Sequence, residues 1–164
     1  LVHFLCVDSS QHLHGPRSPE AYWAIDYVDG LIKGLVAALP ADGPAERTVL
    51  FVVSDHSFLP VDRDVRINAR LRQLGLVGVD PAGRITSAEA RFVMNHGAGY
   101  LGSHGHLPTH ADNGAFFLAA GPGLARGATL ASVRSRDVGA TIAHVLGVRM
   151  AGTDGRVLDE ILTA

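Results

Sequence analysis

The sequence predicts an α/β protein with a largely parallel β-sheet flanked by helices. One observation is an apolar segment at 1–7 (LVHFLCV) that is closed by Asp8 and is expected to form a buried strand. Another is the continuous apolar, β-branched run at 48–53 (TVLFVV), which is typical of a strand covered on both faces. Apolar residues at helical spacing lie between the two runs. A strand, a helix and a strand in this order indicate a βαβ unit and hence parallel pairing.

Length and composition are those of a globular chain. It has 164 residues, 47% of them hydrophobic and 18% charged, which excludes intrinsic disorder and fits one compact domain. The net charge of −2 gives no reason to expect nucleic acid binding, and no apolar run reaches the ~20 residues of a membrane span. The single cysteine, Cys6, excludes an internal disulfide and a CxxC metal site. With nine histidines, any transition-metal site must be built from His and Asp or Glu.

The first helix has a clear beginning. A polar loop is expected to run from Asp8 to Arg17. Ser18 is a good N-cap, and Pro19 suits the first helical position. The apolar face that follows predicts a helix to about Leu39.

Because a chain seldom opens in a core strand, we expect 1–164 to be the C-terminal part of a longer protein.

The second half of the chain is expected to contain shorter elements. The pattern at 87–94 fits a helix or a strand. The expected elements are a helix at 66–74 ended by Gly75, a hairpin of 76–79 and 84–86, a strand at 115–119, a helix at 136–146 ended by Gly147, and one or two turns at 157–162.

Three clusters of polar residues point to metal chemistry. Asp8 and His12 form a D-x-x-x-H pattern after the first predicted strand, and Asp55 and His56 directly follow the second. Ligands of α/β sheets bind beyond the carboxyl ends of parallel strands, so we expect both pairs at one edge. Carboxylates and imidazoles are zinc ligands, and two such sets predict a two-metal site that clamps a phosphoryl group. Taken singly, an Asp at a strand end is more often a turn former or a helix cap. The third cluster lies in a Gly-rich loop and comprises His104, His106 and His110.

These residues resemble the type I phosphodiesterase/nucleotide pyrophosphatase family of the alkaline phosphatase superfamily. The resemblance implies an alkaline-phosphatase-like fold, with 1–164 as the C-terminal portion of a single catalytic domain. Ser57 stands where the family usually has Gly. The motifs that carry the resemblance follow the family's order along nearly the whole chain: DSSQHLHGP at 8–16, SDH at 54–56, RIN at 66–68, GSHG at 102–105, FLAAGPG at 117–123 and GTDG at 152–155.

The resemblance implies two zinc ions and a phosphate ester or nucleotide as substrate. Asp8, His12 and His104 would hold one zinc, and Asp55 and His56 would hold the other. Either His106 or His110 could be the loop ligand in place of His104. The family's Thr or Ser nucleophile and one further Asp ligand are expected upstream of residue 1, so the chain alone should be inactive. The implied reaction is in-line attack on phosphorus followed by hydrolysis of a covalent phosphoryl-enzyme.

Two other functions stay open. A sulfatase, phosphonate hydrolase or phosphomutase of the same superfamily would differ at the nucleophile. A non-catalytic metal-binding module would bind one zinc tightly at Asp8, His12 and His104. The sequence does not choose between an exported and a cytoplasmic protein, and it does not give the oligomeric state.

Overall fold

A computed structural model describes residues 1–40, 45–63, 67–89, 99–107 and 109–163. The chain divides into two compact units. The first consists of residues 1–26 and 58–103, and the second of residues 27–57 and 104–164. In the described part of the chain, no helix combines the length and the apolar character that crossing a membrane requires.

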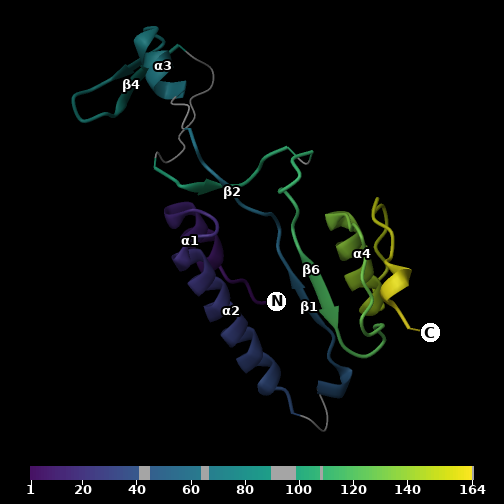
Figure 1. The fold of residues 1–164 in the computed structure, drawn as a ribbon. Helices are drawn as coiled ribbons and strands as arrows, with labels where there is room; N and C mark the ends of the chain where they lie inside the picture. The colour runs from purple at the N-terminus through teal and green to yellow at the C-terminus, as the bar shows by residue number, and fades with distance from the viewer. Residues whose placement is uncertain (41–44, 64–66, 90–98, 108, 164) are drawn as a thin grey trace. The chain divides into compact units, whose positions relative to one another are not determined.

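The first unit contains short helices and two small antiparallel strand pairs (Figure 1). Strand β2 (Leu59–Pro60) pairs with β5 (Gly102–Ser103), and β3 (Val77–Val79) pairs with β4 (Ile85–Ala88). The helices are α1 (Cys6–His14), the beginning of α2 (Pro19–Ala37) and α3 (Ile67–Gln73).

The strand predicted at 1–7 is wrong. Residues 1–5 belong to no regular element, and α1 begins at Cys6, so the loop expected after Asp8 is helical as far as His14. Among the described residues no strand pairs with this segment. A strand here would leave its backbone groups without ladder partners, whereas a helix pairs them internally.

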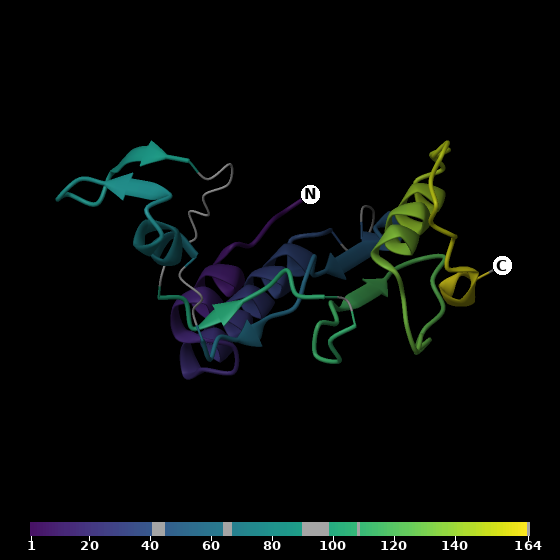
Figure 2. The ribbon, with the colours of Figure 1, turned by 90° about the horizontal axis from the view of Figure 1, so that it is seen from above.

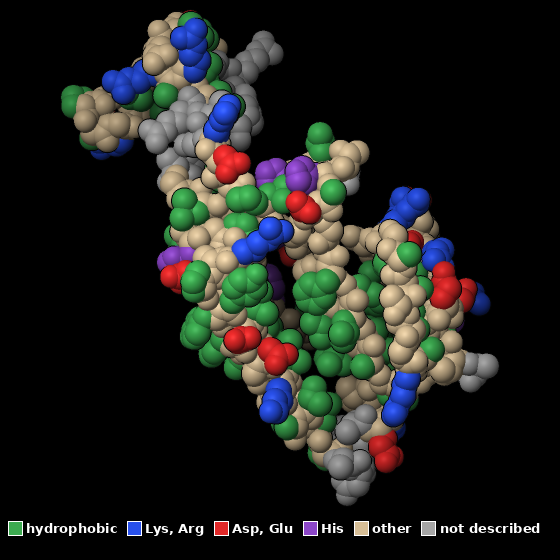
Figure 3. All heavy atoms as spheres, viewed as in Figure 1, with side chains coloured by type: hydrophobic (Ala, Val, Ile, Leu, Met, Phe, Trp, Pro, Cys, Tyr) green, Lys and Arg blue, Asp and Glu red, His purple; other side chains and the backbone are tan. Residues whose placement is uncertain are grey.

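Helix α2 begins as predicted. The Ser18 hydroxyl oxygen accepts a hydrogen bond from the Ala21 backbone N–H at 3.1 Å, which is the N-cap contact. The helix ends at Ala37, two residues before the expected boundary, Leu39. Its buried side chains are small, Ala21 and Ala24. Figure 3 shows apolar side chains gathered over this helix. The large apolar side chains that are exposed along it are Tyr22, Trp23, Ile25, Tyr27, Leu31, Leu35 and Val36.

The predicted helix and hairpin of the first unit are confirmed. Gly75 follows α3 with φ +74°, a conformation that favours glycine. In the hairpin turn, Asp80 Oδ1 accepts hydrogen bonds from the backbone N–H groups of Ala82 and Arg84, both at 2.9 Å. The Arg84 side chain also donates to Asp80 Oδ2 at 2.9 Å. These contacts, first that of the Arg84 backbone N–H, hold the pKa of Asp80 below its ordinary value.

In the second unit the predicted strands form, but their direction differs from the prediction. Strand β1 (Leu50–Val53) pairs antiparallel with β6 (Phe117–Ala120), and Figures 1 and 2 both show the two strands side by side. All three strand pairs of the described residues are antiparallel, so a largely parallel sheet is not found among them. With one neighbour, β1 is only partly buried, and Val53 is exposed.

The C-terminal segment of the second unit packs on helix α4 (Ser135–Val145) and includes the 3₁₀ turn η2 (Asp159–Ile161). Another 3₁₀ turn, η1 (Ala45–Arg47), precedes β1. The fully buried Thr141 hydroxyl donates to the Asp137 carbonyl at 2.7 Å and accepts from the Leu158 N–H at 3.0 Å. The predicted helix end at Gly147 is confirmed, with φ +68°. The local core consists of Leu124, Leu158 and Ile161.

Candidate metal centre

In the first unit, α1 brings Asp8 and His12 together, because residues four apart lie on one face of a helix. His12 Nε2 lies 3.6 Å from Asp8 Oδ1, with the two side chains 17% and 34% exposed. His12 Nδ1 lies 3.0 Å from the Gly102 carbonyl oxygen. A carbonyl only accepts, so in the neutral imidazole Nδ1 carries the proton and Nε2 keeps its lone pair. This is the arrangement of a metal-ligating histidine, whose other ring nitrogen is oriented by a hydrogen bond.

The surroundings of His12 fix its ring in this position. The ring meets Phe58 edge-on with centroids 4.8 Å apart and lies 4.5 Å from the ring of Tyr100. Strand β5 can approach α1 because residue 102 is glycine: a Cβ there would collide with the Gln11 carbonyl oxygen. The close approach of β5 therefore places the Gly102 carbonyl oxygen within hydrogen-bonding distance of His12 Nδ1.

In the second unit, the β1–β6 ladder leads directly to Asp55 and His56. Ser54 N–H donates to the Phe116 carbonyl at 3.2 Å, and its hydroxyl oxygen accepts from the Phe116 N–H at 2.9 Å. Beyond this pair, His56 Nε2 lies 3.5 Å from Asp55 Oδ1, and His56 Nδ1 lies 3.2 Å from the Ser57 carbonyl oxygen. His56 is thus oriented in the same way as His12.

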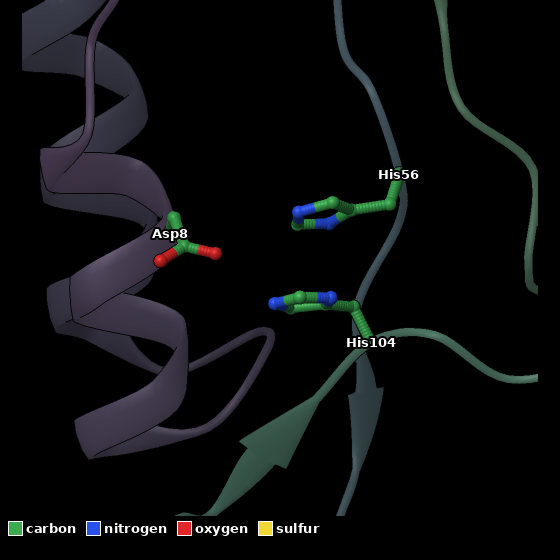
Figure 4. Close-up of side chains that lie close together, drawn as sticks. All are labelled: Asp8, His56 and His104. Carbon is green, nitrogen blue, oxygen red and sulfur yellow. The ribbon is translucent and has the colours of Figure 1, made fainter.

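His104 lies against His56. Their ring centroids are 3.7 Å apart and the angle between the ring planes is 12°. Figure 4 shows the two rings stacked. Figure 4 also labels Asp8, which comes from α1 of the first unit. Donor types that suit zinc occur in both units: the carboxylate of Asp8 in the first, and the imidazoles of His56 and His104 in the second.

The other two histidines of the Gly-rich loop make different contacts. His110 Nδ1 accepts the Asp112 backbone N–H at 3.3 Å. The His106 carbonyl accepts from Asn113 Nδ2 at 2.9 Å, and Asn113 Oδ1 accepts from the Ser57 hydroxyl at 3.1 Å. His104 is therefore the loop histidine that lies in the ring pair with His56.

The predicted ligands thus fall into two groups, one in each unit. In the sequence, Ser57 stands out only as a departure from the family and Gly102 only as part of the GSHG motif, and Asn113 has no such signal. Nothing local in the HADNG segment marks Asn113, because its partner Ser57 lies 56 residues away. The first-unit group comprises Asp8 and His12, and the second-unit group comprises Asp55, His56 and His104.

The chain is similar to known proteins in two comparisons. Residues 1–113, more than half of the chain, match the family described as type I phosphodiesterase / nucleotide pyrophosphatase. The human protein "GPI ethanolamine phosphate transferase 3, catalytic subunit" is 41% identical over 56 residues, which is 34% of this chain. The match covers 5% of that human protein's length. The family match contains both groups of candidate ligands.

Proposed function

Because this chain belongs to the type I phosphodiesterase / nucleotide pyrophosphatase family, we propose that it is the metal-binding part of a zinc-dependent hydrolase of phosphate esters. The observation that carries the proposal is the repeated orientation of the two Asp–His pairs. In both, Nδ1 faces a backbone carbonyl and Nε2 lies 3.5–3.6 Å from a carboxylate. This leaves Nε2 of each ring as the nitrogen that can bind a metal.

The proposed assignment uses the five ligands that the family pattern implies. Bound zinc would supply Lewis-acid stabilisation of the charge that develops on the phosphoryl oxygens. Asp55, which is 81% exposed, is open to solvent and to an entering ion. We place the nucleophile, a Thr or Ser, outside residues 1–164. We also propose that the complete domain has an alkaline-phosphatase-like sheet with parallel strands in addition to the antiparallel pairs described above. Asp8, His12 and His104 would bind the first zinc, and Asp55 and His56 the second.

The proposed substrate is a small phosphate ester or a nucleotide. The donor set favours this class because zinc ligated by carboxylates and imidazoles stabilises phosphoryl transfer, and because the family is described by phosphodiester and pyrophosphate cleavage.

Phosphoryl-group transfer to an alcohol is a second candidate function. The similarity to a human ethanolamine phosphate transferase favours it, although this similarity covers only 56 residues. The two reactions share the attack on phosphorus and differ in the acceptor, which is water in a hydrolase and a hydroxyl group in a transferase. Product analysis of the complete enzyme with a phosphodiester and an added alcohol separates them, since only transfer gives a new ester.

The zinc assignment is tested by metal content. We would purify the chain with zinc and count bound metal by elemental analysis, together with Asp8→Ala and Asp55→Ala variants. Two zinc ions per chain, with one lost in each variant, support the assignment, and one ion lost only in Asp8→Ala supports the first site alone. Asp26→Ala is the matched control, because Asp26 is an exposed carboxylate on α2 outside both groups. A folded chain without zinc contradicts the proposal.

A further inference from the structure

One side chain ties the loop that carries His104 to the segment that carries His56. Asn113 Oδ1 accepts a hydrogen bond from the Ser57 hydroxyl at 3.1 Å, and its Nδ2 donates to the carbonyls of His106 at 2.9 Å and Leu107 at 3.2 Å. Carbonyl oxygens only accept, so the amide must present its NH₂ group to them and its oxygen to Ser57. The contacts therefore fix both the position and the orientation of the amide.

These contacts lie next to the two imidazoles. Ser57 directly follows His56, and His106 comes two residues after His104. Gly105, between the two loop histidines, has φ +81°, so the backbone turns there. The Asn113 amide thus links the segment that carries His56 to the loop that carries His104.

The loop from 104 to 116 contains no helix or strand among its described residues, so its order depends on side-chain and turn contacts. Two backbone hydrogen bonds, from His110 N–H to the Leu107 carbonyl and from Asn113 N–H to the His110 carbonyl, both 3.0 Å, form turns within the loop. These two bonds join loop residues only to one another, so they do not hold the loop against His56. The Asn113 amide, in contrast, bonds the loop to Ser57, the residue that follows His56.

We propose that Asn113, held by Ser57, is a positioning residue that keeps His104 stacked on His56. It acts on the loop and touches no metal or substrate. The consequence for zinc binding rests on the proposed function, whereas the effect on the ring pair does not. Without the Asn113 amide, His104 would have to be brought to a metal from a range of loop positions, at a cost in conformational entropy.

The test begins with the metal-free chain. Nuclear Overhauser contacts between the ring protons of His56 and His104 are measured by NMR, and thermal unfolding is followed by circular dichroism. Asn113→Ala removes all three amide contacts and should abolish the ring contacts. Asn113→Asp, which keeps the acceptor for Ser57 but loses both N–H donors, should do the same. Thr109→Ala is the control, because it removes an exposed neutral side chain from the same loop.

Variants of Ser57 test the other end of the link. Ser57→Ala should weaken the ring contacts, and Ser57→Thr, which keeps the hydroxyl, should restore them. Zinc titration by calorimetry is the second measurement. Loss of a residue that orients a metal ligand typically lowers affinity roughly 10–100-fold, and we expect a loss of that size in Asn113→Ala but not in Thr109→Ala.

The outcomes separate this inference from the proposed function. Ring contacts that persist in Asn113→Ala, or that are absent in the wild-type chain, overturn the inference whatever the zinc result. Equal losses in Asn113→Ala and Thr109→Ala, with a similar fall in melting temperature, also overturn it. Ring contacts that depend on Asn113 in a chain that binds no zinc support the inference and contradict the proposed function. If Asn113→Ala does not fold, Ser57→Ala and its Ser57→Thr rescue decide the question.

Discussion

At the scale of single residues, Gly102 decides whether His12 can be oriented. A Cβ at this position would meet Pro16 Cδ at 2.8 Å and would also collide with the Gln11 carbonyl oxygen. Gly102→Ala must therefore move β5 away from α1 and take the Gly102 carbonyl away from His12 Nδ1. We expect a loss of about 1–3 kcal/mol in the free energy of unfolding, measured by urea denaturation, together with weaker zinc binding.

A matched glycine gives the opposite expectation. Gly139 lies inside α4, and a Cβ there has no atom within 4 Å to meet. Alanine favours a helix interior over glycine by about 1 kcal/mol, so Gly139→Ala should be neutral or stabilising. Equal destabilisation by the two substitutions would contradict the role given to Gly102.

Glu160 and Arg156 form a pair whose effect depends on pH. The Arg156 guanidinium donates to both carboxylate oxygens, at 2.7 and 2.9 Å, and lowers the pKa of Glu160 from 4.5 to about 2. The unfolded chain therefore takes up this proton at a higher pH than the folded chain. The stabilisation is complete above pH 4.5 and is lost as the pH falls through about 2. The difference in stability between wild type and Glu160→Gln, measured by denaturation from pH 6 to about 2, should shrink over this range, and salt should reduce it throughout.

At the scale of elements, the buried Thr141 hydroxyl joins α4 to the C-terminal segment. It accepts the Leu158 N–H and donates to the Asp137 carbonyl. Thr141→Val keeps the shape but leaves the buried Leu158 N–H without its acceptor, which costs about 1–3 kcal/mol. Chemical denaturation should show this loss, while Thr109→Val, at an exposed position, should change stability by less than about 0.5 kcal/mol. Equal effects of the two substitutions would mean that the hydrogen bonds of Thr141 contribute nothing.

The elements that the sequence predicts correctly are those with signals inside the element. Ser18 and Gly147 mark the ends of α2 and α4 through local backbone hydrogen bonding, and the turn at Asp80 is also local. The segment 1–7 fails because a short apolar run suits a buried strand or a helix equally. Strand direction fails for a related reason: the apolar run at 48–53 predicts a strand but not which neighbour it will have.

The candidate site shows the same division. Residue type and spacing predict Asp8, His12, Asp55 and His56 as candidate ligands, since carboxylate and imidazole groups are the donors that zinc uses. The choice of His104 over His106 and His110 comes from the family resemblance. The groups that hold these side chains in place are not found in this way. Gly102 and Asn113 act on residues far away in the chain, at His12 and Ser57, and only the folded structure shows these contacts.

At the scale of the whole molecule, the proposed ligands of the first zinc lie far apart in the sequence. A metal that binds Asp8, His12 and His104 only in the folded chain stabilises that chain by mass action, by about 2.7 kcal/mol at a free zinc concentration one hundred times the dissociation constant. Added zinc should therefore raise the melting temperature, and a chelator should reverse the rise. His104→Ala should remove most of the effect, whereas Asp26→Ala should keep it. Magnesium is the control ion, because it prefers oxygen ligands and near-octahedral geometry. An equal rise with magnesium, or none with zinc, would contradict the assignment of these histidines as zinc ligands.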